Sequence, residues 1–238
     1  MSHEVKLHEA QTSILRELLF VPQAGFAQLQ KPTGLTSDHF MFHINRLMEI
    51  GFVGKVGRGQ YRLTISGKEY ANRLDTDERT IERQAKISAL VVPVRRRGGS
   101  GPLEYMVQRR LKQPFFGRYG FMSGKIRWGE TIEEGAAREL REEAGLQADL
   151  TLTCLYHKLD YTTDGRLLED KHFYILEAAN PQGEFQPEFD SGSNHWHTLE
   201  EIEALDNKFP GVLEVIEHTK SSGISLWEEK YQHNPEDY

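Results

Sequence analysis

Three glutamates between residues 131 and 145 have the types and spacing that most clearly point to chemistry. Glu139, Glu142 and Glu143 stand at i, i+3 and i+4, and a helix that advances about 100° per residue places them on one arc of about 100°. Like charges at this spacing destabilise a helix, so something must offset their repulsion. A hard divalent cation such as Mg²⁺ or Mn²⁺ takes oxygen ligands of this kind. A solvated acidic surface is the alternative that the spacing alone leaves open.

A cation held by these glutamates would support one kind of reaction, the hydrolysis of a phosphoanhydride. It would polarise a phosphoryl oxygen and lower the pKa of a bound water. The elements that position the glutamates are a loop that contains Gly124 and a helix that begins near Thr131 and ends at Gly145. On this helix Ala136 and Leu140 occupy a neighbouring arc, which can pack on a sheet.

The order of residues in this segment resembles the Nudix box. That motif is a Gly, a Glu six residues later, and then Arg-Glu-aliphatic-any-Glu-Glu-any-Gly-aliphatic in fixed register. All its defining positions are present: Gly124, Glu130, Arg138, Glu139, Leu140, Glu142, Glu143, Gly145 and Leu146. The resemblance extends from about Lys86 to the C-terminus.

In the Nudix family the box forms a loop–helix–loop beside a mixed sheet, and its carboxylates bind the metal. The metal ligands and catalytic groups implied by the resemblance are Glu139, Glu142, Glu143, the Gly124 carbonyl and Arg138, which would orient a neighbouring carboxylate. Family members use water and Mg²⁺ or Mn²⁺ to hydrolyse nucleoside diphosphates linked to another group. Glu130 would support the loop and the metal site.

Several charged residues around the box are candidates for further roles. Arg109, Arg110 and Arg118 precede it and are expected, with Glu130, to meet the substrate. A loop carboxylate after the next hairpin often completes the site in this family, and the candidates are Glu184, Glu188 and Asp190. The histidines His157, His172, His195 and His197 show no metal-binding spacing. They are expected to be surface or hydrogen-bonded strand residues.

The segments around the box indicate an α+β protein of two parts. Strands are expected over 87–94, 103–109, 151–161 and 172–178, and helices over 199–205 and 212–220 close the chain. Before them come helices over 7–18, 26–30 and 36–50, a hairpin of 52–56 with 61–64, and a helix that starts at the capping box Ser66-x-x-Glu69. The predicted domains are a winged helix-turn-helix over 1–75, a helical linker over 76–85 and a Nudix-type mixed-sheet α/β/α sandwich over 86–238.

The N-terminal part resembles a winged helix-turn-helix by the order of its elements. In such domains one helix enters the major groove of DNA and the hairpin contacts the backbone. The DNA-binding residues that this implies are His39, His43 and Arg46 on the helix over 36–50, with Lys55 and Arg58 on the hairpin. The near-neutral charge of residues 1–85, 11 Lys and Arg against 10 Asp and Glu, is low for a DNA-binding domain. Protein contact, homodimer formation and a lid over the substrate stay open as alternatives.

Composition excludes other classes of protein. The mean hydropathy is −0.59, and no run approaches the roughly 18–20 apolar residues that a membrane span needs. The beginning of the chain lacks the apolar core of a signal peptide. Cys154 is the single cysteine, which excludes an intramolecular disulfide and suits a reducing, cytoplasmic location.

Two functions follow from these features. The first is an Mg²⁺- or Mn²⁺-dependent Nudix hydrolase that cleaves the pyrophosphate of a nucleoside diphosphate linked to another moiety. The second is a DNA-binding transcriptional regulator that uses its Nudix domain to sense a nucleotide metabolite. They share a nucleotide-type ligand and differ in whether double-stranded DNA is a partner.

Overall fold

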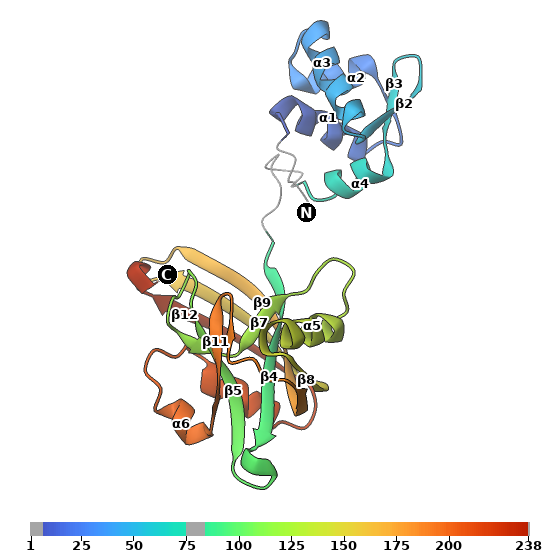
Figure 1. Cartoon of the computed structure of the whole chain (residues 1–238). Coiled ribbons are helices and arrows are strands. Elements are labelled where there is room, and N and C mark those ends of the chain that lie inside the picture. The colour runs from blue at the N-terminus through green and yellow to red at the C-terminus, as the bar shows by residue number, and fades with distance from the viewer. Residues whose placement is uncertain (1–6, 75–83, 238) are drawn as a thin grey trace. The chain divides into compact units, whose positions relative to one another are not determined.

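A computed structural model of the chain describes residues 7–74 and 84–237, in two compact units, Met1–Arg83 and Gln84–Tyr238 (Figure 1). Most of the expected linker over 76–85 lies outside the described residues. Within the described ranges, no helix is long and apolar enough to cross a membrane.

The N-terminal unit combines short helices with a small antiparallel sheet. Its elements are α1 (Glu9–Leu19), β1 (Ala24–Gly25), α2 (Phe26–Gln30), the 3₁₀ turn η1 (Lys31–Thr33), α3 (Ser37–Glu49), β2 (Val53–Gly57), β3 (Gln60–Leu63) and α4 (Ile65–Ala71). The strand order is β1-β3-β2. The helices and the hairpin therefore follow one another as the apolar spacing predicted.

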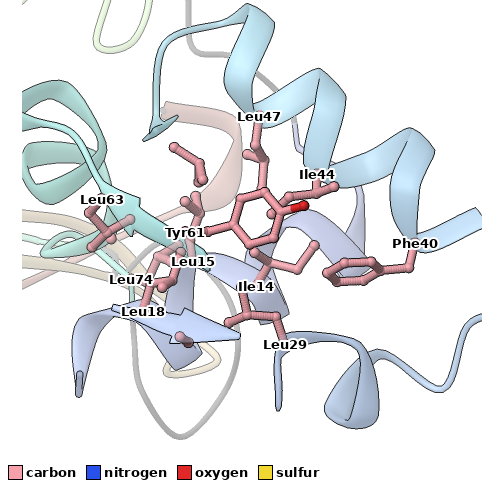
Figure 2. Packing of buried hydrophobic residues seen from close by; sticks show 13 residues of the cluster. Ile14, Leu15, Leu18, Leu29, Phe40, Ile44, Leu47, Tyr61, Leu63 and Leu74 are labelled. Carbon is pink, nitrogen blue, oxygen red and sulfur yellow. The ribbon is translucent and has the colours of Figure 1, made fainter. Parts of the chain in front are cut away.

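One apolar core holds the N-terminal unit together. Ile14 and Leu18 of α1 meet Phe40, Ile44 and Leu47 of α3, and all five are buried (Figure 2). Tyr61 and Leu63 of β3 close this core from the sheet. The i, i+4, i+7 spacing on α3 explains why a single stripe of that helix is buried, whereas α1 is buried at every position from Ala10 to Leu15.

Helix α4 begins two residues earlier than the expected capping box predicts. Its N-cap is Thr64, whose hydroxyl accepts a hydrogen bond from the backbone N–H of Gly67 at 3.0 Å. The prediction that Ser66 and Glu69 start this helix is therefore wrong. Gly67 packs on the backbone of Phe52, the residue directly before β2. A Cβ at Gly67 would lie 1.9 Å from the carbonyl oxygen of Phe52.

The C-terminal unit is built on a mixed nine-stranded sheet. Its main strands are β4 (Lys86–Arg96), β5 (Leu103–Arg110), β8 (Leu146–Thr162), β9 (Leu167–Gly183), β11 (Gly192–His197) and β12 (Ser225–His233), with the short strands β6 (Tyr119–Gly120), β7 (Met122–Lys125) and β10 (Glu188–Phe189). The order is β10-β11-β5-β4-β9-β8-β12, with β6 on β5 and β7 on β4. The pairs β4·β9 and β8·β12 are parallel, and the others are antiparallel.

Helices cover both faces of this sheet (Figure 1). Helix α5 (Ile132–Ala144) packs Ala136 and Leu140 on Met106, Met122 and Leu176. On the other face, α6 (Leu199–Glu203) and α7 (Val212–Thr219) pack on a core that includes Cys154 and Ile175. The α+β class with a mixed sheet, expected from the sequence, is confirmed.

The end of the chain differs from the prediction. The predicted helices over 199–205 and 212–220 are followed by β12, which pairs in parallel with β8 from Ser225 opposite Cys154 to His233 opposite Thr162, and the 3₁₀ turn η3 (Pro235–Asp237) comes last. Charged residues alternate poorly with apolar ones in this strand, so its pattern does not indicate a buried sheet position. Strands β8 and β9 also extend well beyond the predicted 151–161 and 172–178.

A bulge in β8 changes which face of the sheet its side chains occupy. Leu152 pairs with Leu176, whereas Cys154 pairs with Ile175, so β8 has one extra residue at this point. Leu152 therefore packs on the α5 side, and Cys154 and Tyr156 pack on the α7 side. Beyond the bulge, every second residue of β8 counted from Cys154 faces the α7 side.

Candidate active site

The candidate site lies beside β4, where the strand that pairs with β4 changes from β7 to β5. Along its first half, Ser88–Val91 pair with β7, and only Val94–Arg96 at its far end pair with β5. The other end of β5 pairs with β6 instead, through Gln108 and Arg109. The sheet therefore splits on this side of β4, with β7 on β4 and β6 on β5.

A cavity of about 630 Å³ occupies this region. This volume is in the range of pockets that hold a small-molecule ligand. Its lining includes Glu139 and Glu143 from α5, Gly124 from β7 and the ring of Phe209. The described basic residues that line it are Lys86, Arg110, Lys112, Lys125, Arg127, Lys158 and Lys171. This basic excess suits an anionic ligand.

Local sequence places α5 at the edge of the cavity. Thr131 and Glu134 form a reciprocal capping box at its start, and Gly145 takes the left-handed conformation (φ 70°) that ends it. The expected limits of this helix are therefore confirmed. The apolar stripe faces the sheet, and the glutamates are left at the side where β7 approaches.

Arg138 connects the carboxylates of the box. Its side chain is 8% exposed and donates to both oxygens of Glu130, at 2.6 and 2.9 Å. It also bonds to Glu139, lies 3.4 Å from Glu142, and donates to the carbonyl of Lys125. Hydrogen bonding to Arg138 lowers the pKa of Glu130 to about 2. Part of the expected repulsion is thus offset by the protein itself.

Glu143 is held differently from its two neighbours. Gln108 donates to its carboxylate at 2.9 Å, and Asn194 donates to its backbone carbonyl at 2.7 Å. Gln108 also donates to Asn194, which locks the pair together. Burial raises the pKa of Glu143, while the bond from Gln108 and the nearby Arg110 act in the opposite direction. Glu143 is therefore fixed at the cavity wall through both its side chain and its backbone.

The oxygen atoms near Gly124 fit a divalent cation. A Cβ at this residue would lie 1.8 Å from the carboxyl carbon of Glu139, so only glycine lets the β7 backbone approach this glutamate. Carboxylates and a backbone carbonyl are the hard donors that Mg²⁺ and Mn²⁺ prefer. The residues present therefore fit the metal that the resemblance implies.

The expected substrate-binding residues lie in different places. Arg110 lines the cavity and donates to the carbonyls of Pro114 and Gln113. Arg109 is exposed and is not among the lining residues, because adjacent positions of a strand face opposite sides. Arg118 lies over the rings of Phe115 and Phe209 beside the cavity. Glu130 is engaged by Arg138 and is also outside the lining, so its position fits support of the loop.

The three loop carboxylates that were candidates for a catalytic base do not reach the cavity in this structure. Glu184, Glu188 and Asp190 are exposed and are not among the described residues that line it. Phe189 and Ser191, their neighbours in the chain, do line it.

Several residues of the site carry no motif and were missed by the sequence reasoning. Gln108 and Asn194 come from β5 and β11, and Arg127 donates to Glu142 at 3.3 Å from the loop after β7. Lys158 and Lys171 line the cavity from β8 and β9. For Lys158 and Lys171 the sequence offered one signal. Both are charged residues at strand positions that alternate with more exposed ones, and a charged residue at a buried position is unusual unless it is paired.

Two of the four histidines, His157 and His172, lie close together, which their spacing did not predict. Ligand atoms of His157, Asp170 and His172 lie within 4.8 Å of one another. The ring nitrogens of His157 are already engaged, each 3.0 Å from a carboxylate oxygen of Asp170 or Glu228. His157 is thus a hydrogen-bonded strand residue, as expected.

The predicted DNA-binding residues of the N-terminal unit are exposed with one exception. His39 and Arg46 on α3, and Lys55 and Arg58 on the hairpin, are all exposed. His43 instead stacks on His8 with ring centroids 4.4 Å apart, and its Nδ1 is buried without a hydrogen-bond partner. Its ring faces α1, so it does not share the exposed face.

Known proteins resemble mainly the C-terminal unit. A family model described as "NUDIX domain" matches residues 85–218, more than half of the chain. An oxidized purine nucleoside triphosphate hydrolase of Danio rerio is 33% identical over 86 residues, which are 36% of this chain and 53% of that protein. Its namesake from Mus musculus is 31% identical over 90 residues, 38% and 55% of the two chains. The chain spans about half the length of these curated relatives.

Solved structures share the fold. The NUDIX domain of Shewanella oneidensis NrtR, in a cocrystal with ADP ribose, gives a TM-score of 0.51 at 18% identity, over 66% of this chain and 97% of that one. The mMutator MutT protein from Bacillus halodurans gives 0.51 at 18%, over 64% and 93%. With the box intact on α5 and the family model matched across the sheet, the chain belongs to the NUDIX family.

Proposed function

We propose that this protein is an Mg²⁺- or Mn²⁺-dependent hydrolase that cleaves the pyrophosphate of a nucleoside diphosphate linked to another moiety. The observation that carries the proposal is the cavity itself. It joins the box carboxylates Glu139 and Glu143 to a basic, aromatic-walled space large enough for more than a pyrophosphate.

The residues of the box divide the work in this proposal. Glu139, Glu142, Glu143 and the Gly124 carbonyl would hold the cation, which supplies charge neutralisation at the phosphates and a more acidic water. Arg138 keeps Glu139 oriented toward β7. Arg110 and Arg127 on the cavity wall offer positive charge to the phosphates. Gln108 and Asn194 fix Glu143 in place for its role in holding the cation.

A substrate panel tests this function. Full-length protein is incubated with nucleotide sugars, dinucleotides and oxidised purine nucleoside triphosphates, and nucleoside monophosphate is measured by chromatography with Mg²⁺, Mn²⁺ or EDTA. We expect metal-dependent release that falls about 100-fold or more in Glu142→Gln and Glu143→Gln. Glu133→Gln, an exposed glutamate in the first turn of α5, is the control. Release that persists in EDTA or in Glu142→Gln would contradict the proposal.

A second substrate class is favoured by the curated relatives. The proteins of Danio rerio and Mus musculus are described as oxidized purine nucleoside triphosphate hydrolases, and the matched segments are about a third identical. In that case the triphosphates of the panel, and not the diphosphate derivatives, would show the higher kcat/KM.

For the N-terminal unit we infer a winged helix-turn-helix that binds duplex DNA. The element order α1-β1-α2-α3-β2-β3 and the exposed basic residues Arg46, Lys55 and Arg58 support this. Fluorescence anisotropy with duplex fragments at several salt concentrations is the test. Binding should weaken with salt and in Arg46→Ala or Arg58→Ala, but not in Lys68→Ala on α4. Without such a difference, a protein-contact role is favoured.

A further inference from the structure

Four charged residues form a grid on the cavity side of β8 and β9. Lys158 stands directly opposite Lys171, and Asp160 directly opposite Glu169. Lys86 of β4 is the partner of Lys171 on its other side, so three lysines follow one another across three strands. Like charges opposite each other destabilise a sheet. This arrangement therefore has a cost that sheet formation does not explain.

The lysines differ in how closely the carboxylates hold them. Lys158 donates to both oxygens of Asp160, at 2.7 and 2.9 Å, and Asp160 is also 2.7 Å from the ring of His233. Lys86 lies 2.5 Å from Glu169, whereas Lys171 lies 3.6 Å from the same carboxylate. Lys171 is thus the ammonium group with the longest ion pair of the three, and it lines the cavity.

Burial disfavours the charge on Lys158 and Lys171, whereas the carboxylates of Asp160 and Glu169 favour it. Burial lowers the pKa of Lys158 and of Lys171, and the pKa of Lys171 is lowered further by Lys158. Lys158 Nζ lies 5.7 Å from the ring centroid of Phe209 and 5.2 Å from that of Tyr231. Of these groups, Lys158, Lys171 and Phe209 line the same cavity as Glu139 and Glu143. A ligand that contacts the box can therefore continue toward the lysines.

We propose that Lys158 and Lys171 bind a second anionic group of the substrate, a phosphate or carboxylate carried by the moiety that is linked to the pyrophosphate. This inference rests on the proposed function and adds the chemistry of the leaving moiety. An anion would lie between the two opposed ammonium groups and add to the compensation that Asp160 and Glu169 already give them. The opposed lysines then destabilise the sheet but prepare a binding site, and such an exchange of stability for function is common.

Matched pairs of ligands test the proposal. UDP-glucuronate and UDP-glucose differ by a carboxylate, and coenzyme A and dephospho-coenzyme A differ by a phosphate. Equilibrium binding is measured by calorimetry with Mg²⁺ on the full-length Glu142→Gln protein, with and without Lys171→Met. Lys230→Met is the matched control, because Lys230 lies on the neighbouring strand β12 opposite Leu159, on the other face of the sheet.

The anionic member of at least one pair should bind about tenfold more tightly, and Lys171→Met should reduce this ratio to about one. Lys230→Met should leave the ratio unchanged. Lys171→Met removes a like-charge contact with Lys158 and also the 3.6 Å ion pair with Glu169. Its melting temperature is therefore measured as well, and loss of the ratio at an unchanged melting temperature separates a binding role from a structural one. Equal binding within both pairs, or a ratio that survives Lys171→Met, would overturn the proposal. A ratio that responds to Lys171→Met without turnover of any panel substrate by the wild type would uphold this site while the proposed hydrolase activity fails.

Discussion

Helices α3 and α5 have similar construction, but their polar faces differ in how far they are buried. Each has 13 residues, a buried apolar stripe and a polar face. On α3 the charged pair Arg46–Glu49 is 3.0 Å apart with both side chains more than half exposed. On α5 Arg138 is 8% exposed and bonds to Glu130 of the preceding loop. The difference indicates that the polar face of a helix can form a binding site where another segment of the chain packs over it, as the loop with Glu130 does on α5.

Gly124→Ala should give the largest effect, because it separates that closing segment from α5. The added Cβ would overlap the Glu139 carboxyl group, at 1.8 Å, and a displacement of about 1 Å at a reacting site costs about 100-fold in rate. Hydrolysis of the best panel substrate is the measurement. Gly57→Ala in β2 is the control, since nothing lies within 4 Å of a Cβ there. Unchanged kcat/KM in Gly124→Ala would show that the close approach is not needed.

Arg138→Met should destabilise the C-terminal unit by about 2 kcal/mol, because it leaves a partly buried carboxylate network without its cation. All three tryptophans, Trp128, Trp196 and Trp227, are in this unit, so urea unfolding followed by their fluorescence reports on it. Arg141→Met, exposed on the same helix, should change little.

The same variant has a pH signature. Arg138 holds the pKa of Glu130 at about 2, below its ordinary 4.5, so this stabilisation is present above the ordinary pKa and is lost as the pH falls toward 2. The difference between Arg138→Met and wild type should therefore shrink in that window. A pH-independent difference would mean that packing of the arginine stem, and not its charge, is responsible.

His43→Phe should produce a smaller, pH-dependent change in the N-terminal unit. Burial, together with His8 and His39, lowers the pKa of His43. The folded unit thus binds this proton less well than the unfolded chain, and its stability falls as the pH drops below about 6.5. Hydrogen exchange of peptides from α1 and α3 at pH 7 and pH 5 should show this loss in wild type and less of it in the variant. Tryptophan fluorescence of the other unit, which should not respond, is the control.

Arg46→Ala should give the smallest effect on stability, below about 0.5 kcal/mol, because an exposed i, i+3 pair contributes little. Hydrogen exchange of α3 peptides measures it. A loss as large as that of Arg138→Met would remove the contrast between the two helices.

The box and its helix were predictable because their determinants are local. Thr131, Glu134 and Gly145 set the ends of α5 within its own sequence, and the spacing of Glu139, Glu142 and Glu143 follows from helical geometry. Arg110 was a candidate and does line the cavity, whereas Arg109 next to it does not. Which of two adjacent arginines faces a site depends on the phase of the strand, and composition does not reveal that phase.

The partners of the box were not predictable, because they come from distant segments. Gln108 and Asn194 meet Glu143 from strands 35 and 51 residues away. The closing strand β12 was missed because its parallel pairing with β8 is a tertiary contact without a local signature.

By itself, the amino-acid sequence determined the chemistry of this protein: an acidic helix face, its caps and the glycine beside it, because these depend on neighbours within about 20 residues. The tertiary structure alone decided what that chemistry faces. One extra residue in β8, between Leu152 and Cys154, turns Lys158 toward the cavity. Side chains alternate along a strand, so a single bulge reassigns every residue after it to the opposite face.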